Sequence, residues 1–418
     1  MHSGTVIDTL IHKPAPGHLA YTERHTHGEV HRMARGLAAQ MSAVADGKPV
    51  CLCAGDRAVV AAALLAGLHS GIPLILPHAA SAATLADLRA EMPYTAAIVD
   101  GEGGDRLPSG VIALKADGIA AQEGAPQGQL GLGPHSPWVY LFTGGSTGHP
   151  KIWTKTPTNL LAETDYLVKR FGVGPGDSIL STAPPNHIYG LLYAVLMPLL
   201  GGARVSAATP VFPHEILNSL ASNRSTILVS LPVHYRSLRP HAYDDHQLRL
   251  AFSSAGPLDP ADGQAFSATT GAPLFEIYGS TETGGIASRC RHRGETDLTP
   301  FEPVQVDVSE AGAAVTSAFI SPDLPRDAEG RFRLADRLEA TDHGTLRLKG
   351  RRDGIVKVGG KRVDLEMVRE TIKAQAKVSD AVVFSLAGEA GRDTEIVAVV
   401  EGQTSVQALR KDDGRLDR

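Results

Sequence analysis

The chain has 418 residues, of which 43% are hydrophobic, so it is long enough to form two or three packed domains. Its 40 basic and 45 acidic side chains give a formal charge of -5, and Lys and Arg are dense only in residues 349–362. Nucleic acid is therefore not the expected partner. The sequence shows neither a secretory leader nor a membrane-spanning stretch, and its three cysteines suit a reducing compartment, so we expect a cytoplasmic protein.

The first part of the chain alternates two kinds of pattern. In residues 29–100, helix-like periodicity is interrupted by short apolar runs at 73–77 and 95–100, which predicts a parallel α/β layer. A connection rich in Gly, Gln and Pro then leads to a predicted strand at 138–142. Apolar residues between Asn159 and Phe171 share one helical face, and Gly172 is placed to end that helix. We therefore expect the loop after residue 142 to be followed by a helix.

That loop, residues 143–151, is the most informative segment. Glycine allows the backbone to approach an anion closely, while hydroxyl groups and a lysine supply hydrogen-bond donors around it. A P-loop would need Lys directly after the last glycine, but His149 follows Gly148, which argues against that class. The loop predicts a nucleotide triphosphate site, with an ordinary flexible loop as the alternative. Its candidate ligands are Thr143, Gly144, Gly145, Ser146, Thr147, Gly148 and Lys151.

The middle of the chain contains further strand candidates. Continuous apolar runs bounded by turn residues occur at 178–183, 203–208, 226–232, 248–256 and 273–279, as expected for buried parallel strands. Ligands are expected at the carboxyl ends of such strands. After Phe301 the alternating pattern predicts antiparallel strands, with a hairpin turn at 341–344. From about Asp353 the pattern predicts a small α+β unit.

A second polar segment follows the strand at 273–279. Tyr278 offers a flat face for a base, Ser280 and Thr281 offer hydroxyl groups, and Glu282 offers a carboxylate. Mg²⁺ prefers carboxylate and phosphate oxygens, so Glu282 is a sensible metal ligand beside a triphosphate. The alternative is a polar loop at a strand end. A third segment, residues 350–366, combines Arg351, a glycine pair and a basic cluster.

These three segments, in this order, resemble the adenylate-forming superfamily of acyl-CoA synthetases, adenylation domains and luciferases. The resemblance covers nearly the whole chain, beginning near residue 29. It implies an α/β fold, with a large N-terminal domain of two α/β sheet layers plus a distorted β-barrel. A small α+β lid follows. The resemblance assigns residues 1–352 to the large domain and residues 353–418 to a shortened lid that rotates about Asp353.

The resemblance also implies roles for the nucleotide-binding residues. The loop at 143–151 would hold the β- and γ-phosphates, Tyr278 would stack on adenine, and Thr281 would contact the α-phosphate. Gly279 and Ser280 would also belong to the cofactor site. Glu282 would hold Mg²⁺. The ribose would be bound by Asp336, which follows Ala335 where the family usually has Gly, and by Arg351, although a structural salt bridge is the alternative for this pair. Ala255 and Gly256 would line the adenine and acid sites.

The segment 183–192 resembles the part of the family that carries the acid-site gate. This points to His187, with Tyr189 and Gly190 shaping the pocket, although a lone histidine is more often structural. The apolar residues after it predict a buried helix. The segment lacks the Asp that holds the ammonium group in amino-acid adenylation domains. We therefore favour an aryl or fatty acid as the substrate.

The end of the chain departs from the family pattern. Gly414 and Arg418 fit the lid motif, but Arg415 occupies the position of the lysine that bridges the acid and the α-phosphate. Arg keeps the charge in a different shape, so adenylation is expected to weaken, and a chance match is the alternative. Lys357, with Lys361 and Arg362, would meet the phosphates of CoA or a carrier protein, or would form a solvated basic surface.

The resemblance implies an enzyme that joins a carboxylic acid to AMP from ATP, releases pyrophosphate, and transfers the acyl group to a thiol. The cofactors implied are ATP, Mg²⁺ and CoA or a carrier-protein phosphopantetheine. Two alternatives remain open. One is a degenerate relative that binds ATP or an acyl-adenylate as a sensor or scaffold without turnover, and the other is an enzyme that performs only one half-reaction.

Overall fold

The computed structural model describes residues 6–7, 10, 15–101, 103–116, 131–143, 151–243, 245–351, 354–358, 361–375, 378–386 and 395–402. Within these residues, six strands form a first sheet in the order β4-β3-β1-β2-β5-β6. All neighbouring strands are parallel except β5 and β6, which confirms the predicted parallel layer. The strands are β1 (Val50–Cys53), β2 (Leu74–Leu76), β3 (Ala96–Val99), β4 (Ile112–Lys115), β5 (Val139–Thr143) and β6 (Lys151–Lys155).

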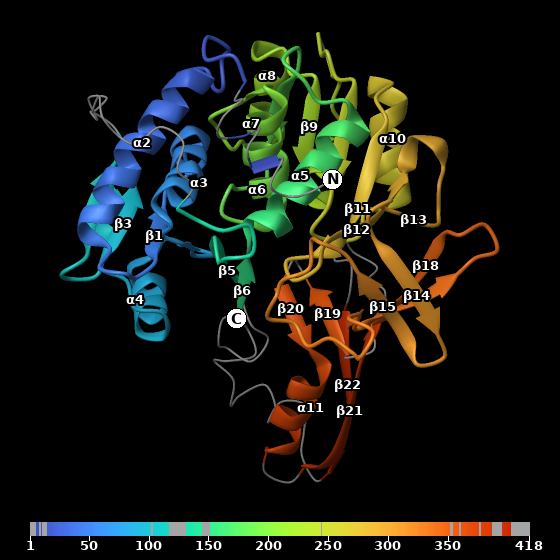
Figure 1. The fold of residues 1–418 in the computed structure, drawn as a ribbon. Helices are drawn as coiled ribbons and strands as arrows, with labels where there is room; N and C mark the ends of the chain where they lie inside the picture. Colours follow the sequence, from blue (N-terminus) through green and yellow to red (C-terminus); the bar gives the residue numbers. More distant parts are fainter. Residues whose placement is uncertain are drawn as a thin grey trace.

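The helices of this layer are α2 (His27–Val44), α3 (Arg57–Ser70) and α4 (Ala82–Glu91), with a short 3-10 helix, η1 (Gly103–Arg106). Helix α3 is buried along most of its length because Ala, Leu and Val occupy nearly every position. Helix α2 lies beside it (Figure 1) and buries one apolar face. Thr26 begins α2 with a capping box in which its hydroxyl accepts from the Glu29 N–H.

A second sheet in the described part of the chain has the strand order β13-β12-β11-β10-β9-β7-β8. The strands from β7 to β11 are parallel, whereas β12 and β13 are antiparallel. The five strands predicted between residues 178 and 279 are therefore confirmed. The strands are β7 (Ser178–Ser181), β8 (Arg204–Val205), β9 (Ile227–Ser230), β10 (Leu250–Ser253), β11 (Leu274–Ser280), β12 (Gly284–Cys290) and β13 (Thr299–Pro300).

The helices around this sheet include the predicted buried segment after His187, which contains one π-helical stretch, η2, and is confirmed. Gly172 ends α5 in the left-handed conformation, as expected. No helix in the described ranges is long and apolar enough to cross a membrane. The elements are α5 (Pro157–Phe171), α6 (Ile188–Leu191), η2 (Leu192–Leu196), α7 (Met197–Gly201), α8 (Pro213–Ser222), α9 (Pro232–Leu238), α10 (Pro260–Thr270) and η3 (Arg291–Arg293).

One local prediction is wrong. The loop after Thr143 does not lead directly into a helix, because β6 comes first and pairs antiparallel with β5. The short run from Lys151 to Lys155 contains the aromatic Trp153 and β-branched residues, which favour a strand. Helix α5 begins only after Thr156, whose side chain caps it. The glycine-rich segment therefore connects two strands of a hairpin.

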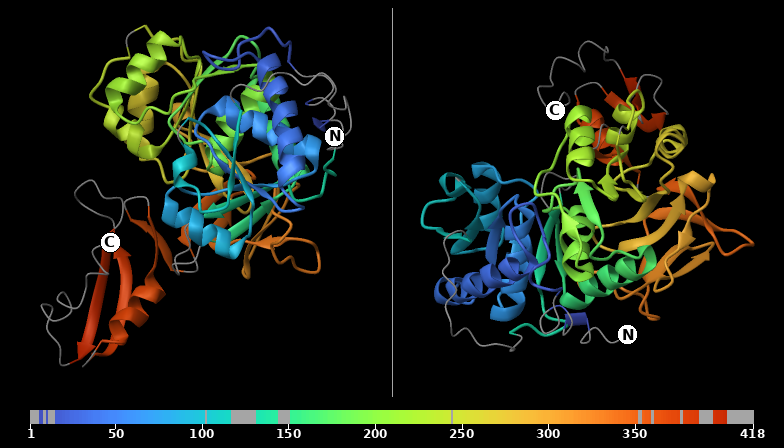
Figure 2. Two further views of the ribbon diagram at one scale, coloured as in Figure 1. Left: turned by 90° about the vertical axis from the view of Figure 1, so that its left-hand side faces the viewer. Right: turned by 90° about the horizontal axis from the view of Figure 1, so that it is seen from above.

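The remaining strands form small antiparallel sheets, as predicted. The turn at 341–344 joins β17 and β18, and Gly344 has the positive φ of 72° that this turn needs. A small α+β unit after residue 354 projects from the rest of the molecule (Figure 2). The elements are β14 (Gln305–Ser309), β15 (Gly312–Thr316), β16 (Phe332–Arg333), β17 (Asp336–Ala340), β18 (Leu346–Arg351), β19 (Ile355–Val358), β20 (Lys361–Asp364), α11 (Leu365–Lys373), β21 (Val378–Leu386) and β22 (Glu395–Gly402).

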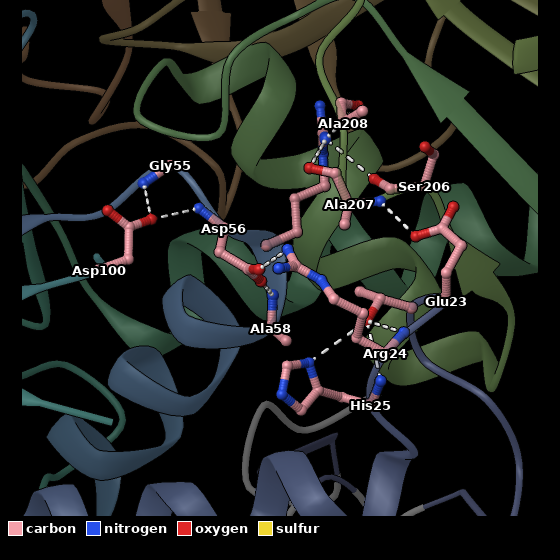
Figure 3. A network of polar contacts seen from close by, with 12 residues as sticks. Glu23, Arg24, His25, Gly55, Asp56, Ala58, Asp100, Ser206, Ala207 and Ala208 are labelled. Atoms are coloured by element: carbon pink, nitrogen blue, oxygen red, sulfur yellow. Dashed lines mark hydrogen bonds and ion pairs between the residues drawn. The ribbon is translucent and has the colours of Figure 1, made fainter. Parts of the chain in front are cut away.

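A polar network joins the two large sheets at the start of α3. Asp56 caps α3 by accepting from the Ala58 N–H at 2.8 Å, and it also pairs with Arg24 (Figure 3). The adjacent Arg57 is completely buried. Its guanidinium donates to carbonyl oxygens at the ends of β7 and β8 and just after them, at Ser181, Ala183, Ser206, Ala207 and Ala208. Burial lowers the pKa of Arg57 to about 10, which leaves it charged at neutral pH.

We expect Arg57→Met to destabilise the fold strongly, because it removes the donors to several buried carbonyl oxygens. A loss of about 3 kcal/mol or more in the free energy of unfolding is expected from unsatisfied buried groups. Arg24→Met is the matched control, since the Arg24 side chain is 65% exposed and its ion pair contributes about 1 kcal/mol at most. Urea unfolding measures both. Equal unfolding midpoints for the two variants would contradict this account.

Candidate active site

The predicted phosphate loop is described at its two ends. Thr143, the last residue of β5, pairs with Lys151, the first residue of β6. The Thr143 hydroxyl accepts a hydrogen bond from the Trp153 indole N–H at 3.1 Å, while Lys151 is exposed. Thr143 and Lys151, the two ends of the predicted loop, therefore lie one strand spacing apart on neighbouring strands of a hairpin. The other predicted ligands, Gly144, Gly145, Ser146, Thr147 and Gly148, lie outside the described residues.

The turn between β11 and β12, residues 280–285, is held tightly. Ser280 and Thr283 bond to each other through their hydroxyls at 2.9 Å and also through backbone N–H groups. A Cβ atom on Gly279 would lie 2.3 Å from the Gly284 carbonyl oxygen, so only glycine fits there. The ladder shifts register between Tyr278 and Gly279. These constraints fix the direction in which the turn leaves the sheet.

Thr281 and Glu282 lie at the tip of this turn and are half-buried. Glu282 Oε2 is buried without a hydrogen-bond partner among the described residues. Its own carbonyl oxygen accepts from the Ser321 N–H at 2.8 Å and from Lys155 Nζ at 3.1 Å. Buried carboxylate oxygens are normally satisfied, so an unpartnered one fits a site for a hard cation such as Mg²⁺.

Tyr278 and Asp336 are brought together from positions 58 residues apart. The Tyr278 hydroxyl donates to Asp336 Oδ2 at 2.7 Å. Asp336 opens β17 and pairs directly with Arg351 at the end of β18. The side chain of Arg351 lies outside the described part of the structure. Three residues assigned to the base and the ribose on sequence grounds therefore converge on one region.

The loop after β10 lies against the same region. The Ser254 hydroxyl donates to the Ile277 carbonyl oxygen at 3.1 Å, which ties the loop to β11. Ala255 has a φ of 69°, a left-handed conformation that residues with a Cβ rarely adopt. Such strain costs about 1–3 kcal/mol and is concentrated at functional sites. Gly256 follows at the turn, where a Cβ would meet only Pro232 at 3.8 Å.

Hydrogen bonds hold the predicted acid-site segment between the two sheets. The Asn186 amide donates to the carbonyl oxygens of Pro77 at 2.9 Å and His78 at 3.2 Å, just after β2. His187 precedes α6 and is exposed at one edge. Protein packed around its ring lowers the pKa of His187 below the ordinary value, and the nearby His78 lowers it further. Among the described residues, no hydrogen bond joins His187 to the 280–285 turn.

Tyr189 and Gly190, predicted to shape the pocket, are both fixed by close contacts with the surrounding protein. Tyr189 is buried and donates its hydroxyl to the Ser230 carbonyl oxygen at 3.2 Å, which anchors α6 to the end of β9. A Cβ atom on Gly190 would lie 2.1 Å from the Pro184 carbonyl oxygen. The close approach of these two backbones thus requires glycine.

Of the two residues predicted in the small unit, one is described only in its backbone and the other lies outside the described part. Lys357 lies in β19 opposite Arg362, so both belong to one hairpin, but the side chain of Lys357 is outside the described part. Arg415 lies wholly outside it.

Sequence reasoning missed two polar clusters beside these segments. In the first, Lys155, Asn159 and Glu163 are buried next to the 280–285 turn. The sequence did contain a signal for this cluster. Asn159 and Glu163 are four positions apart in α5 and so lie on one helix face, and polar residues on a buried face indicate a polar contact. In the second, His234 Nδ1 lies 2.7 Å from the Thr182 hydroxyl, at the carboxyl ends of β7 and β9.

A cavity of about 300 Å³ lies at the amino ends of β7 and β9, on the opposite edge of the second sheet from the 280–285 turn. Its lining includes none of the residues predicted from the sequence. The polar residues that line it include Asp177, Arg204, Arg224, Thr226 and Gln247. It is therefore separate from the candidate site.

Known proteins resemble this chain in both sequence and fold. The model of a family described as AMP-binding enzyme matches residues 11–315. The sulfoacetate–CoA ligase of Cupriavidus necator is 26% identical over 68% of this chain, and the benzoate–CoA ligase of Thauera aromatica is 26% identical over 82%. This chain spans 60% of the first relative's length and 67% of the second's.

Among solved structures, the ATP-bound MatB of Rhodopseudomonas palustris has a TM-score of 0.73 and 21% identity. The likeness covers 99% of this chain and 92% of that one. At this level of identity the likeness establishes the fold. It confirms the α/β class and the arrangement of several sheets that the sequence predicted.

We expect Gly190→Ala to destabilise the protein, because its new methyl group would overlap the Pro184 carbonyl. Overpacking of this kind costs about 1–3 kcal/mol, and the contact is with rigid backbone. Gly174→Ala is the control, since nothing lies within 4 Å of the position its Cβ would take. Thermal unfolding distinguishes the two variants. A Gly190→Ala protein as stable as Gly174→Ala would show that the backbone approach is not tight.

We expect NMR titration to give His187 a pKa below its ordinary value of 6.5. Replacing His78 with Gln should raise the pKa of His187, because it removes a neighbouring positive charge, although burial should still keep it below 6.5. The unfolded chain binds this proton more readily than the folded one, so His187 favours unfolding as the pH falls below 6.5. A pKa at or above 6.5 in the unaltered protein would contradict the prediction.

Proposed function

Since the chain belongs to the AMP-binding enzyme family, we propose that it activates a carboxylic acid with ATP and passes the acyl group to a thiol. In the first step a carboxylate oxygen attacks the α-phosphorus of ATP, an acyl-adenylate forms, and pyrophosphate leaves. In the second step the thiol sulfur attacks the acyl carbon and AMP leaves. Both steps bring anions together, so positioning and charge stabilisation account for most of the rate.

The observation that carries this proposal is the convergence around the carboxyl end of β11. The Tyr278 hydroxyl bonds to Asp336, and the unpartnered oxygen of Glu282 lies at the tip of the turn that follows the same strand. A planar ring, a carboxylate for the ribose and a carboxylate for a cation are the parts that an ATP site requires. Their common location supports one nucleotide site built from distant segments.

In this proposal each segment contacts a different part of ATP. The loop between Thr143 and Lys151 binds the β- and γ-phosphates with its backbone N–H groups. Tyr278 contacts adenine together with the loop at Ala255, and Thr281 contacts the α-phosphate. Asp336 binds the ribose hydroxyls, and Arg351 is the second ribose contact. The strained Ala255 holds its loop in a shape that the ligand then uses.

Glu282 is the residue proposed to hold Mg²⁺. Its buried oxygen lacks a partner among the described residues, and its chemistry suits a hard cation. A bound Mg²⁺ would neutralise phosphate charge during the transfer. The turn that carries Glu282 is already fixed by Ser280 and Thr283, so the carboxylate needs little reorganisation when ligands bind.

An aryl or fatty acid remains the proposed substrate. The segment around His187 has no Asp to hold an ammonium group. The residues of η2, which follow soon after it in the chain, are buried and mostly apolar. One relative is named for benzoate and another for sulfoacetate, so the family accommodates both aromatic and small charged acids.

The proposed thiol acceptor is CoA, with carrier-protein phosphopantetheine as the second candidate. Both relatives described above are named as CoA ligases, which favours CoA. Lys357, in the hairpin of β19 and β20, is the proposed phosphate contact. We further propose that residues 353–418 rotate as a lid relative to residues 1–352, with Asp353 as the hinge and Arg415 replacing the usual lysine. The proposed compartment is the cytoplasm.

The second candidate function is nucleotide or acyl-adenylate binding without complete turnover. Its support is Arg415, whose planar guanidinium is not equivalent to a lysine ammonium in a tight site. Catalysis limited to one half-reaction is the third. Each option differs in whether pyrophosphate and a thioester are produced.

Pyrophosphate release, measured with a panel of aryl, fatty and amino acids in the presence and absence of CoA, tests the proposal. We expect release with an aryl or fatty acid and thioester formation when CoA is added. Glu282→Gln should slow release by about a hundredfold, since metal-assisted charge stabilisation contributes several kcal/mol. The exposed Glu302→Gln is the control and should match the unaltered enzyme.

Other outcomes of the same assay select the alternatives. Release without thioester formation would favour a half-reaction, and no release with any acid would favour the binding protein. Arg415→Ala is included as a further variant. If it releases pyrophosphate at the unaltered rate, Arg415 does not replace the lysine.

A further inference from the structure

Lys155 is an unusual residue for its location. It is the last residue of β6, the strand that follows the proposed phosphate loop, yet it is only 1% exposed. Its Nζ donates to the carbonyl oxygen of Glu282 at 3.1 Å and to that of Phe319 at 3.0 Å. Lys155, on the strand that follows the phosphate loop, therefore bonds to the backbone of Glu282, the proposed metal ligand.

Helix α5 reinforces this connection from the same side. Glu163, 2% exposed, accepts from the Gly285 N–H at 2.8 Å through Oε1. A Cβ atom on Gly284 would lie 2.4 Å from Glu163 Oε2, so the turn passes too close to this carboxylate for any larger residue. The Asn159 amide donates to the carbonyl oxygens of Ala318 at 2.7 Å and Ile320 at 3.0 Å, on either side of Phe319.

Burying the charges of this cluster costs free energy. Burial lowers the pKa of Lys155 and raises that of Glu163, and attraction between the two groups opposes both shifts. Glu282 and Asp323 also lie close enough to stabilise the ammonium. Apolar residues of similar volume usually stabilise a buried site as well as an ion pair does. The contribution of Lys155 to stability therefore gives little reason for a lysine at this position. Its bonds to two backbone carbonyl oxygens give a stronger reason, because they require one particular arrangement of the backbone.

We propose that Lys155 is a positioning residue that, with Glu163 as its buried counter-charge, holds the backbone of Glu282 so that its carboxylate faces the nucleotide phosphates. This inference rests on the proposed function. The bond to the Glu282 carbonyl fixes the peptide that follows Glu282, and the bond from Gly285 to Glu163 fixes the other side of the turn. The turn is then held in place from β6 and α5, which are the elements that follow the phosphate loop.

The test compares nucleotide binding with and without Mg²⁺, so it does not depend on turnover. The main variant is the double substitution Lys155→Met and Glu163→Gln, which removes both charges together and leaves no buried charge of this pair unmatched. Titration calorimetry with α,β-methylene-ATP measures affinity. We expect Mg²⁺ to improve binding at least tenfold less in the variant than in the unaltered protein, while Mg²⁺-free binding changes less than twofold.

Arg249→Met is the matched control. It removes an arginine whose side chain is 40% exposed and which pairs with the buried Asp177 at 2.7 Å, at the opposite edge of the second sheet from Glu282. It should lower the melting temperature without altering the effect of Mg²⁺. If the double variant behaves in the same way, Lys155 is merely structural and the inference is overturned.

Two further outcomes are informative. If the double variant does not fold, as judged by circular dichroism, Glu163→Gln alone replaces it, because it keeps both the shape and the acceptor for Gly285. It should reduce the effect of Mg²⁺ at least threefold, and an unchanged effect overturns the inference. If the unaltered protein binds no α,β-methylene-ATP with or without Mg²⁺, the proposed function fails and this inference fails with it.

Discussion

The buried bonds from Lys155 and Glu163 to the 280–285 turn are the constraint on which the candidate site depends. They connect β6 and α5, which follow the glycine-rich loop, to the turn that carries Glu282. A site for a triphosphate must hold several negative charges at fixed positions, and a turn on the protein surface would not hold a carboxylate steadily among them. Anchoring the backbone from beneath leaves the side chain of Glu282 available for a ligand. The same contacts thus stabilise the fold and fix the geometry of the candidate site.

Much of the fold followed from local patterns in the sequence. Continuous apolar runs predicted the parallel strands, Gly172 predicted the end of α5, and the turn at 341–344 predicted a hairpin. Strand β6 was missed because two lysines and a short length conceal its pairing with β5. Such pairing depends on a neighbouring strand, and a local pattern does not contain that information.

The sequence named separate parts of the candidate site but not the contacts that connect them. Tyr278 and Glu282 were proposed because their side chains are the kinds that ligands need, and Asp336 was proposed because it matches the family motif. Lys155 and Glu163 were not recognisable, because their partners are backbone atoms more than a hundred residues away. A lysine in a sequence reads as a solvated surface residue unless the packing around it is known. Roles that depend on long-range backbone contacts therefore require the three-dimensional structure.

The same structure separates the residues proposed to bind the nucleotide from those proposed to bind the acid. Tyr278 and Asp336, proposed for the nucleotide, lie on β11 and β17, whereas Asn186, beside His187, bonds to the loop after β2 in the other sheet. Arg57 holds the backbone just before this segment to the start of α3. In the proposed site, a change around His187 would then reshape the acid pocket without moving the 280–285 turn, because different buried contacts fix the two regions. Relatives named for acids as different as benzoate and sulfoacetate are consistent with such a division.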